Sequence, residues 1–279
     1  GARELQFLPP YQEKTQFTAE MLLANMEWAS VDRAMLLQGP TYGECNEYVS
    51  QTLELEAARL SGAAYLDPWE SQPLEAYEVI LAMGRFRAIK LEFAVESGLC
   101  GLHPEARLDA PELDWLWARM ETDRLVLVLD LGAIGTASYQ SEAVNAIARA
   151  HPALRIVVAH LGQPTLAAEA DPELWKSWEQ QIDLGRHDNV WFDTSALPAK
   201  VVEEGYPYPS VERYLQLAVD RIGAGKLMWG SDQPGLLSQL SLPQLVELGR
   251  RHMRFLPELD QQMVLGGTAL QVYGSGSAT

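Results

Sequence analysis

Short runs of consecutive apolar residues alternate along this chain with longer segments in which apolar residues recur every three or four positions. Continuous apolar runs that end at turn residues are typical of strands buried on both faces, and the longer period is typical of amphipathic helices. The apolar runs predict strands at 34–37, 63–66, 88–91, 125–129, 156–159, 190–192 and 227–229. The periodic segments predict a first helix that Thr18 caps, ending at residue 28, and further helices at 44–60, 73–83, 111–120 and 142–150.

This alternation predicts an α/β protein with a parallel sheet and right-handed crossovers. Seven strands fall one short of a (β/α)8 TIM barrel, which takes roughly 250 residues. We therefore expect one TIM-barrel domain at 1–273 whose first strand lies before residue 1 or is very short near 4–8, followed by a flexible tail at 274–279. A doubly wound open sheet is the alternative, but no GxGxxG loop follows any predicted strand.

Composition narrows the class of partner. The chain has 21 Lys and Arg against 38 Asp and Glu, a net charge of −17, which disfavours nucleic acid and anionic membranes as partners. Cys45 and Cys100 have neither disulfide-framework nor zinc-ribbon spacing, and no apolar run has the roughly 18 residues that a membrane span needs. No signal peptide is recognisable. We expect a cytoplasmic protein with a small-molecule substrate, and a homo-oligomer is compatible with the sequence.

Polar residues follow the predicted strands at the point where each strand ends. In a TIM barrel these ends converge on the active site. The residues are Gln38, Asp67, Lys90 with Glu92, Asp130, His160, Asp193 and Asp232. Asp67 and Asp193 also fit turn or cap positions, so both interpretations stay open for them.

His160 and Asp232 are the strongest catalytic candidates among these residues. His160 ends a buried strand before Gly162, and neutral imidazole serves as a metal ligand or as a general base. Asp232 follows the last strand, where a carboxylate can ligate a metal and accept a proton from an attacking water. The other four histidines are predicted to lie on the surface: His103, His151, His187 and His252.

Four side chains are candidates for substrate binding. Lys90 and Glu92 fit either an ion pair across the barrel mouth or a site in which Lys90, with Arg85 or Arg87 nearby, binds a substrate carboxylate. Gln38 ends the first predicted strand, and Trp229 ends the last and could stack on a planar substrate. The long connection at 93–111 is expected to cover the site.

Several motifs resemble the amidohydrolase-related branch of the amidohydrolase superfamily. They are VVAHLG around His160, VWFDTSA around Asp193, LMWGSDQP around Asp232, the closing VLGGTALQVYG, and the early TAEMLLANMEWASVDRAMLLQG followed by NEYV. The resemblance extends over nearly the whole chain. It implies a TIM-barrel fold. It also implies one of the activities of that branch, which contains metal-dependent hydrolases, lactonases acting on carboxylated rings and decarboxylases of carboxylated aromatics. It also makes His160 the strand-six histidine and Asp232 the strand-eight aspartate.

Two departures from that pattern affect the metal site. No His-x-His pair precedes Thr18, and Asp130 stands where the family usually has a strand-five histidine. The remaining candidate ligands for a divalent ion, zinc or manganese, are His160, Asp130 and Asp232. This set does not make a closed zinc site, because catalytic zinc usually has three protein ligands and favours histidine.

These observations favour a hydrolase in which Asp232, with or without a metal, orients a water that attacks an acyl carbon. His160 would polarise the carbonyl or relay a proton. The resemblance favours a lactone or ester of a small carboxylated molecule as substrate. Two alternatives remain open: a metal-dependent decarboxylase of a carboxylated aromatic, and a non-catalytic ligand-binding barrel.

Overall fold

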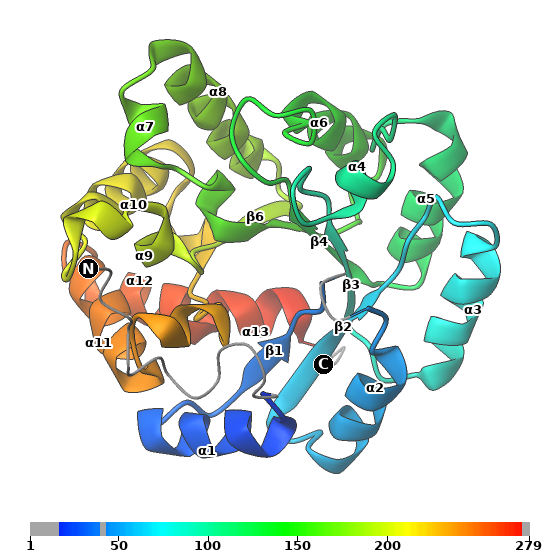
Figure 1. Cartoon of the computed structure of the whole chain (residues 1–279), viewed down its shortest axis with the longest axis horizontal. Helices are drawn as coiled ribbons and strands as arrows, with labels where there is room; N and C mark the ends of the chain where they lie inside the picture. The colour runs from blue at the N-terminus through cyan, green and yellow to red at the C-terminus, as the bar shows by residue number, and fades with distance from the viewer. Residues whose placement is uncertain (1–16, 40–42, 275–279) are drawn as a thin grey trace, which may run out of the picture.

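The computed structural model describes residues 17–39 and 43–274, in which seven parallel strands form one curled sheet. Each strand pairs with the next one along the chain, and helices surround the sheet (Figure 1). The strands are β1 (Ala34–Leu36), β2 (Leu60–Tyr65), β3 (Ala88–Glu92), β4 (Val126–Asp130), β5 (Ile156–Val158), β6 (Val190–Asp193) and β7 (Leu227–Met228). The predicted α/β barrel architecture is confirmed. Among the described residues no strand joins β7 to β1, which is consistent with a missing first strand.

The helices alternate with the strands along the chain. The longer ones are α1 (Ala19–Ala29), α2 (Asn46–Leu55), α3 (Pro73–Met83), α5 (Asp114–Thr122), α6 (Ser141–Ala150), α8 (Pro172–Ile182), α10 (Pro209–Ile222) and α11 (Leu242–His252). Shorter ones are α4 (Leu99–Leu102), α7 (Leu166–Glu169), α9 (Leu197–Lys200), α12 (Glu258–Gln262) and α13 (Thr268–Tyr273). The predicted helix at 44–60 ends earlier, at Leu55, because Leu60 pairs with Ala34 in the sheet. Strand pairing there overrides local helical periodicity.

Alternation along the strands separates two apolar layers. One face packs against the helices, and the opposite face lines the barrel interior. The interior cluster consists mostly of small or medium side chains: Ala63, Ala88, Val126, Val128, Val157 and Met228. Two residues beyond Ala88, and again two beyond Val128, the same alternation places Lys90 and Asp130 on this inner face. The polar site therefore continues the apolar interior toward the carboxyl ends of the strands.

The C-terminal helix completes the interior. Val272 and Tyr273 of α13 belong to the same cluster as the interior strand residues. Arg155 donates hydrogen bonds to the carbonyl oxygens of Val272 and Arg124, which ties the end of α13 to the sheet. At β7, the amide of Trp229 donates to the carbonyl of Val264 at 2.7 Å. A backbone carbonyl of the C-terminal helical segment thus accepts the amide that follows the last strand.

His252 corrects one expectation about surface histidines. Its side chain on α11 is buried, and its Nε2 donates to the carbonyl of Pro207 at 2.6 Å. No local pattern indicates this contact, because the carbonyl lies 45 residues away along the chain. In the part of the chain that the structure describes, no helix has the length and apolar character required to cross a membrane.

Replacing Tyr273 by alanine should destabilise the fold by about 3 kcal/mol, because the ring is buried in the barrel interior and its loss leaves a cavity. Tyr206→Ala is the matched control, since that ring is 55% exposed and should cost under about 1 kcal/mol. Chemical denaturation of both variants measures the difference. Equal costs would show that α13 does not support the barrel interior.

Candidate functional site

The site is built around a backbone turn that follows β5. Four consecutive residues have positive φ: His160 at 57°, Leu161 at 51°, Gly162 at 69° and Gln163 at 58°. The left-handed region costs a non-glycine residue roughly 1–2 kcal/mol, so such a run persists only where surrounding groups hold it. Strain of this kind is concentrated at functional sites.

Side chains from neighbouring elements hold the turn from outside. The indole Nε1 of Trp178 donates to the carbonyl of Leu161 at 2.8 Å, and the Tyr139 hydroxyl donates to that of Gly162 at 2.9 Å. A Cβ at Gly162 would lie 2.1 Å from Oε1 of Gln181, so only glycine fits there. Tyr139 and Trp178 thus hold the turn through its backbone carbonyls.

The imidazole of His160 is held between two carboxylates. Its Nε2 lies 3.0 Å from Oδ2 of Asp130, and its Nδ1 lies 2.8 Å from Oγ of Ser195. The Ser195 hydroxyl donates its proton to Oδ1 of Asp193, so it must accept one from Nδ1 of His160. Both ring nitrogens then donate, which makes His160 an imidazolium.

The charges around His160 are consistent with this protonation state. Burial alone would lower the pKa of His160, but the hydrogen bond and charge of Asp130, with the charges of Asp193 and Asp232, raise it to about 9. Asp193 also accepts the backbone amide of His160 at 3.1 Å through Oδ1. One carboxylate therefore supports both the turn and, through Ser195, the ring.

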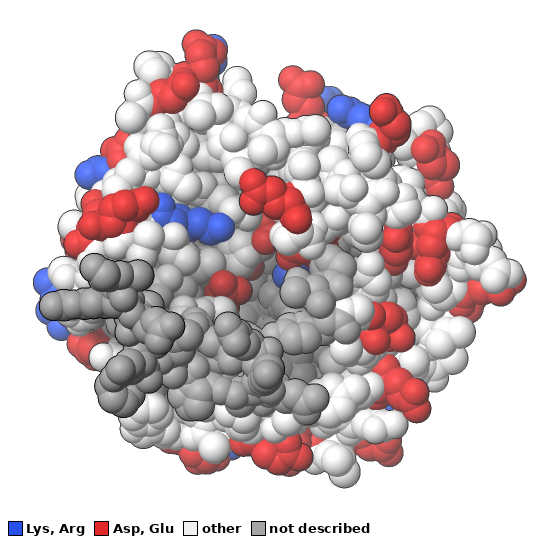
Figure 2. All heavy atoms as spheres, viewed as in Figure 1, with Lys and Arg blue, Asp and Glu red and all other residues white. Residues whose placement is uncertain are grey.

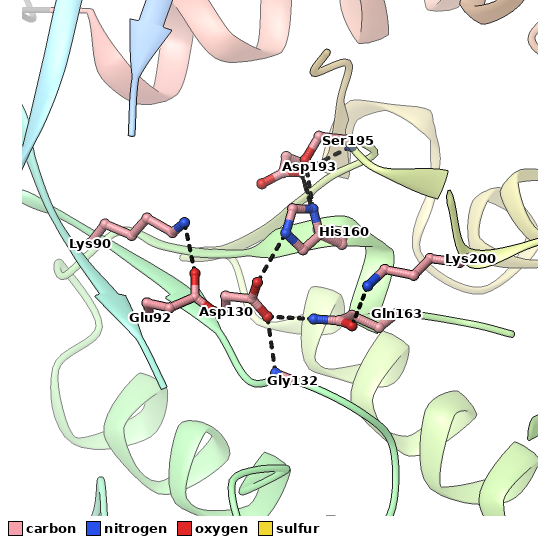
Figure 3. Close-up of polar contacts among 9 residues, drawn as sticks. All are labelled: Lys90, Glu92, Asp130, Gly132, His160, Gln163, Asp193, Ser195 and Lys200. Atoms are coloured by element: carbon pink, nitrogen blue, oxygen red, sulfur yellow. Dashed lines mark hydrogen bonds and ion pairs between the residues drawn. The ribbon is translucent and has the colours of Figure 1, made fainter. Parts of the chain in front are cut away.

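Asp130 is held by a chain of hydrogen bonds on its other side (Figure 3). Its Oδ1 accepts from the amide of Gly132 at 2.9 Å and from Nε2 of Gln163 at 2.5 Å. Lys200 donates in turn to Oε1 of Gln163 at 2.6 Å. Burial opposes ionisation of Asp130, but its hydrogen bond and ion pair with His160 outweigh burial and hold the pKa of this carboxyl well below its usual range.

Lys90 and Glu92 form an ion pair on the inner face of β3. The two charged atoms are 3.0 Å apart, and both side chains are nearly buried. Burial would lower the pKa of Lys90, but the charges of Glu92 and Asp130 raise it, so the ammonium stays charged. Burial raises the pKa of the Glu92 carboxyl, which Lys90 only partly counteracts. The structure thus favours the ion-pair interpretation over a Lys90 that is free to bind a substrate carboxylate.

Asp232 is the least constrained carboxylate in the group. Its backbone is left-handed, with φ of 52°, and its side chain is exposed to solvent. Within residues 17–39 and 43–274 its carboxylate accepts no hydrogen bond. Partial enclosure by the protein raises its pKa, and the charge of Asp193 adds to this, whereas His160 opposes it. Figure 2 shows a central hollow with acidic side chains in and around it.

Two residues predicted to bind substrate have other roles. Nε2 of Gln38 donates to Oδ1 of Asn46 and to the carbonyl of Ala63, both at 2.9 Å, and its Oε1 accepts the amide of Cys45. Its amide therefore joins β1, β2 and the start of α2. Substrate binding by Gln38 stays a prediction, with its amide already hydrogen-bonded within the protein.

Trp229 belongs to the helix-facing layer. Its indole packs against Gly249 of α11, where a Cβ would lie 2.5 Å from Nε1. The strand alternation explains this, because Met228 is the residue that faces the barrel interior. The indole is only partly buried, and the stacking of Trp229 on a substrate stays a prediction.

Asp67 occupies a turn, which is one of the two roles that the sequence left open for it. Its carboxylate accepts the amide of Trp69 at 3.0 Å and contacts Nε2 of His103 at 2.8 Å. Asp193, in contrast, combines the turn interpretation with a place in the site. Its Oδ1 accepts the amide of Ser195 at 3.0 Å as well as the bonds described above.

Sequence reasoning missed Gln163 and Lys200. Gln163 follows Gly162 in the turn, so the glycine was a signal for unusual backbone but not for the amide's partner. Lys200 lies 37 residues from Gln163, on the short helix α9, and no local pattern links the two.

The described residues do not fit a metal site. No group of three or more His, Cys, Asp or Glu side chains in this part of the chain could hold an ion, so His160, Asp130 and Asp232 do not form a ligand set here. Both nitrogens of His160 and both oxygens of Asp130 are already in hydrogen bonds. Oδ2 of Asp193, buried without a hydrogen-bond partner, and the Asp232 carboxylate remain. These are fewer donors than the three protein ligands usual for catalytic zinc.

Gly162→Ala should lower the free energy of unfolding by about 3 kcal/mol, because a left-handed alanine and a clash with buried Gln181 add together. Gly84→Ala separates the two effects. Gly84 has φ of 65° and ψ of 12° with nothing within 4 Å of a new Cβ, so its replacement should cost only about 1 kcal/mol. Urea denaturation measures both values. If the two variants are equally stable, the turn is not packed as described.

Comparison with known proteins agrees with the resemblance in the motifs. A sequence model of the amidohydrolase family matches residues 3–275. L-fucono-1,5-lactonase of Burkholderia ambifaria is 35% identical over 96 residues, which are 33% of this chain. The match spans only 30% of the lactonase's length.

Solved structures share the fold over most of the chain. An amidohydrolase from Burkholderia multivorans with bound HEPES has a TM-score of 0.73 at 22% identity, covering 91% of this chain and 88% of that one. Another crystal form of that protein holds zinc. The probable 2-pyrone-4,6-dicarboxylic acid hydrolase of Acinetobacter baumannii, with citric acid bound, has a TM-score of 0.74 at 14% identity and covers 95% of this chain and 92% of that one. Decarboxylases also occur among the similar structures.

The family match covers nearly the whole sequence, and the seven-stranded sheet has the same architecture as these proteins. The chain therefore belongs to the amidohydrolase family.

Proposed function

We propose that this protein hydrolyses a small lactone, with Asp232 as the general base for the attacking water. The observation that carries the proposal is the contrast between two carboxylates near His160. Asp130 is committed to three hydrogen bonds, whereas the Asp232 carboxylate is solvent-accessible and accepts none from the described residues. A base needs an accessible carboxylate whose pKa lies nearer neutrality than usual, and the pKa of Asp232 is raised.

In the proposed reaction Asp232 removes a proton from water as the oxygen attacks the acyl carbon of the ring. Negative charge then develops on the carbonyl oxygen, and the fixed positive charge of His160 favours it electrostatically. The ring C–O bond breaks, and Asp232 returns its proton to the leaving alkoxide. The product is a hydroxy acid, and Asp232 is again a carboxylate. His160 acts through its charge, because both of its N–H groups are used within the protein.

The partial match to a lactonase supports the choice of lactones as the substrate class. The contacts around His160 favour catalysis over a passive ligand-binding barrel. They hold a buried imidazolium on a strained backbone turn, and both features cost free energy. Decarboxylation of a carboxylated aromatic remains the competing reaction and is separated by its product, carbon dioxide instead of a ring-opened acid.

Asp232→Asn should lower kcat/KM about 100-fold or more on any lactone that the wild type hydrolyses, since the amide cannot take a proton from water. Asp220→Asn, the same change at an exposed position on α10, should stay within about twofold of wild type. A panel of sugar lactones and γ-lactones is followed by acid release in a pH-stat, with carbon dioxide measured on carboxylated aromatics. Activity of Asp232→Asn within a few-fold of wild type would remove this residue as the base, and carbon dioxide release without ring opening would contradict the proposed reaction.

A further inference from the structure

Among the residues that the structure describes, no carboxylate pairs with the positive charge of Lys200. Its Nζ donates to the neutral amide oxygen of Gln163 at 2.6 Å. Within residues 17–39 and 43–274, no Asp or Glu oxygen lies within 4.0 Å of that nitrogen. An ammonium group has three donors, and one of them is used here. In a chain with 38 acidic and 21 basic residues, a half-buried lysine without an ion pair is unexpected.

The neighbouring lysine shows the contrast. Lys90 lies on the opposite side of the His160–Asp130 pair in Figure 3 and is neutralised by Glu92 at 3.0 Å. Its charge is therefore already used within the protein, and it is nearly buried. Lys200 comes from α9 on the other side, with its ammonium directed toward Gln163 and the centre of the site.

Lys200 is also electrostatically close to the proposed base. Its charge lowers the pKa of Asp232, although the two groups are not in ion-pair contact. A substrate whose acyl carbon is presented to Asp232 can therefore place a second substituent near Lys200. Gln163 keeps the ammonium in place, because its amide is oriented by two partners that have fixed roles. Lys200 can only donate to it, and the Asp130 carboxylate can only accept from it.

We propose that Lys200 binds a carboxylate on the substrate, so that the preferred substrate is an anionic lactone whose acid group lies at Lys200 while its ring carbonyl lies at Asp232. The ring chemistry in this statement rests on the proposed lactonase function, whereas the binding of a carboxylate by Lys200 does not. This assigns to Lys200 the role that the sequence had suggested for Lys90. It also explains how an anion enters a mouth that is otherwise rich in carboxylates.

The test compares substrates that differ only in charge. γ-Carboxy-γ-butyrolactone carries the acid group, and the corresponding carboxamide is its neutral match. Lys200→Met should lower kcat/KM for the acid by about 10- to 100-fold, the effect of losing a hydrogen bond to a charged group, and change the amide by less than about threefold. Lys200→Arg should recover part of the activity on the acid. Lys176→Met, at an exposed site on α8, is the matched control and should change neither.

A binding experiment separates this proposal from the proposed function. Tetrahydrofuran carboxylate has the acid group but no lactone bond, and its carboxamide is again the neutral match. Titration calorimetry should show wild type binding the acid about 10-fold or more tightly than the amide, with the preference lost in Lys200→Met and kept in Lys176→Met. If wild type opens no lactone but shows this preference, the proposed function fails and the carboxylate site stands.

Two results would overturn the role of Lys200. Equal losses on acid and amide would mean that Lys200 only orients Gln163 and, through it, Asp130. An unchanged preference for the acid in Lys200→Met would place the anion elsewhere. Thermal unfolding of each variant is measured alongside, and Lys200→Arg keeps the comparison usable if Lys200→Met folds poorly.

Discussion

The buried positive charge of His160 is the feature on which the rest of the site depends. An imidazolium in the interior is costly unless carboxylates and hydrogen bonds compensate for the lost water. Asp130 supplies one partner directly, and Asp193 supplies the other through the Ser195 hydroxyl. Because Asp193 also holds the amide of His160, the charge of the ring and the shape of the turn are stabilised by the same groups. A change in the charge of His160 would therefore also affect the backbone turn.

This arrangement determines which groups remain for chemistry. The carboxylate of Asp130 is used to hold His160, and Glu92 is used to hold Lys90. Asp232 and Lys200 are left at the solvent side with their charges less completely matched. An accessible base and a half-buried cation that lie close enough to interact electrostatically are suited to a substrate with two functional groups. The same commitment of His160 and Asp130 explains why the described residues do not assemble a metal site.

The barrel makes the site possible through its strand periodicity. Small side chains such as Ala63 and Ala88 fill the interior together with Tyr273 from the C-terminal helix. Further along the inner face, toward the carboxyl ends of the strands, charged side chains replace the apolar ones. The parallel register of β3 and β4 places Glu92 beside Asp130. Neighbouring strands therefore bring their ends to one place even though the sheet described here has seven strands and stays open between β7 and β1.

The sequence by itself determined the strand and helix order and the parallel fold, because periodicity is a local property of the chain. Strand-end position is local too, and it made His160, Asp130 and Asp232 candidates for the site. Local periodicity misplaced the end of α2, where pairing with β1 decides the structure. Only the tertiary structure decided that Trp229 faces a helix, that Gln38 joins strands and that Lys90 is neutralised by Glu92. It also brought Lys200 to Gln163. These facts depend on which side chains from distant segments meet and use up each other's hydrogen bonds and charges, and no single stretch of sequence contains that information.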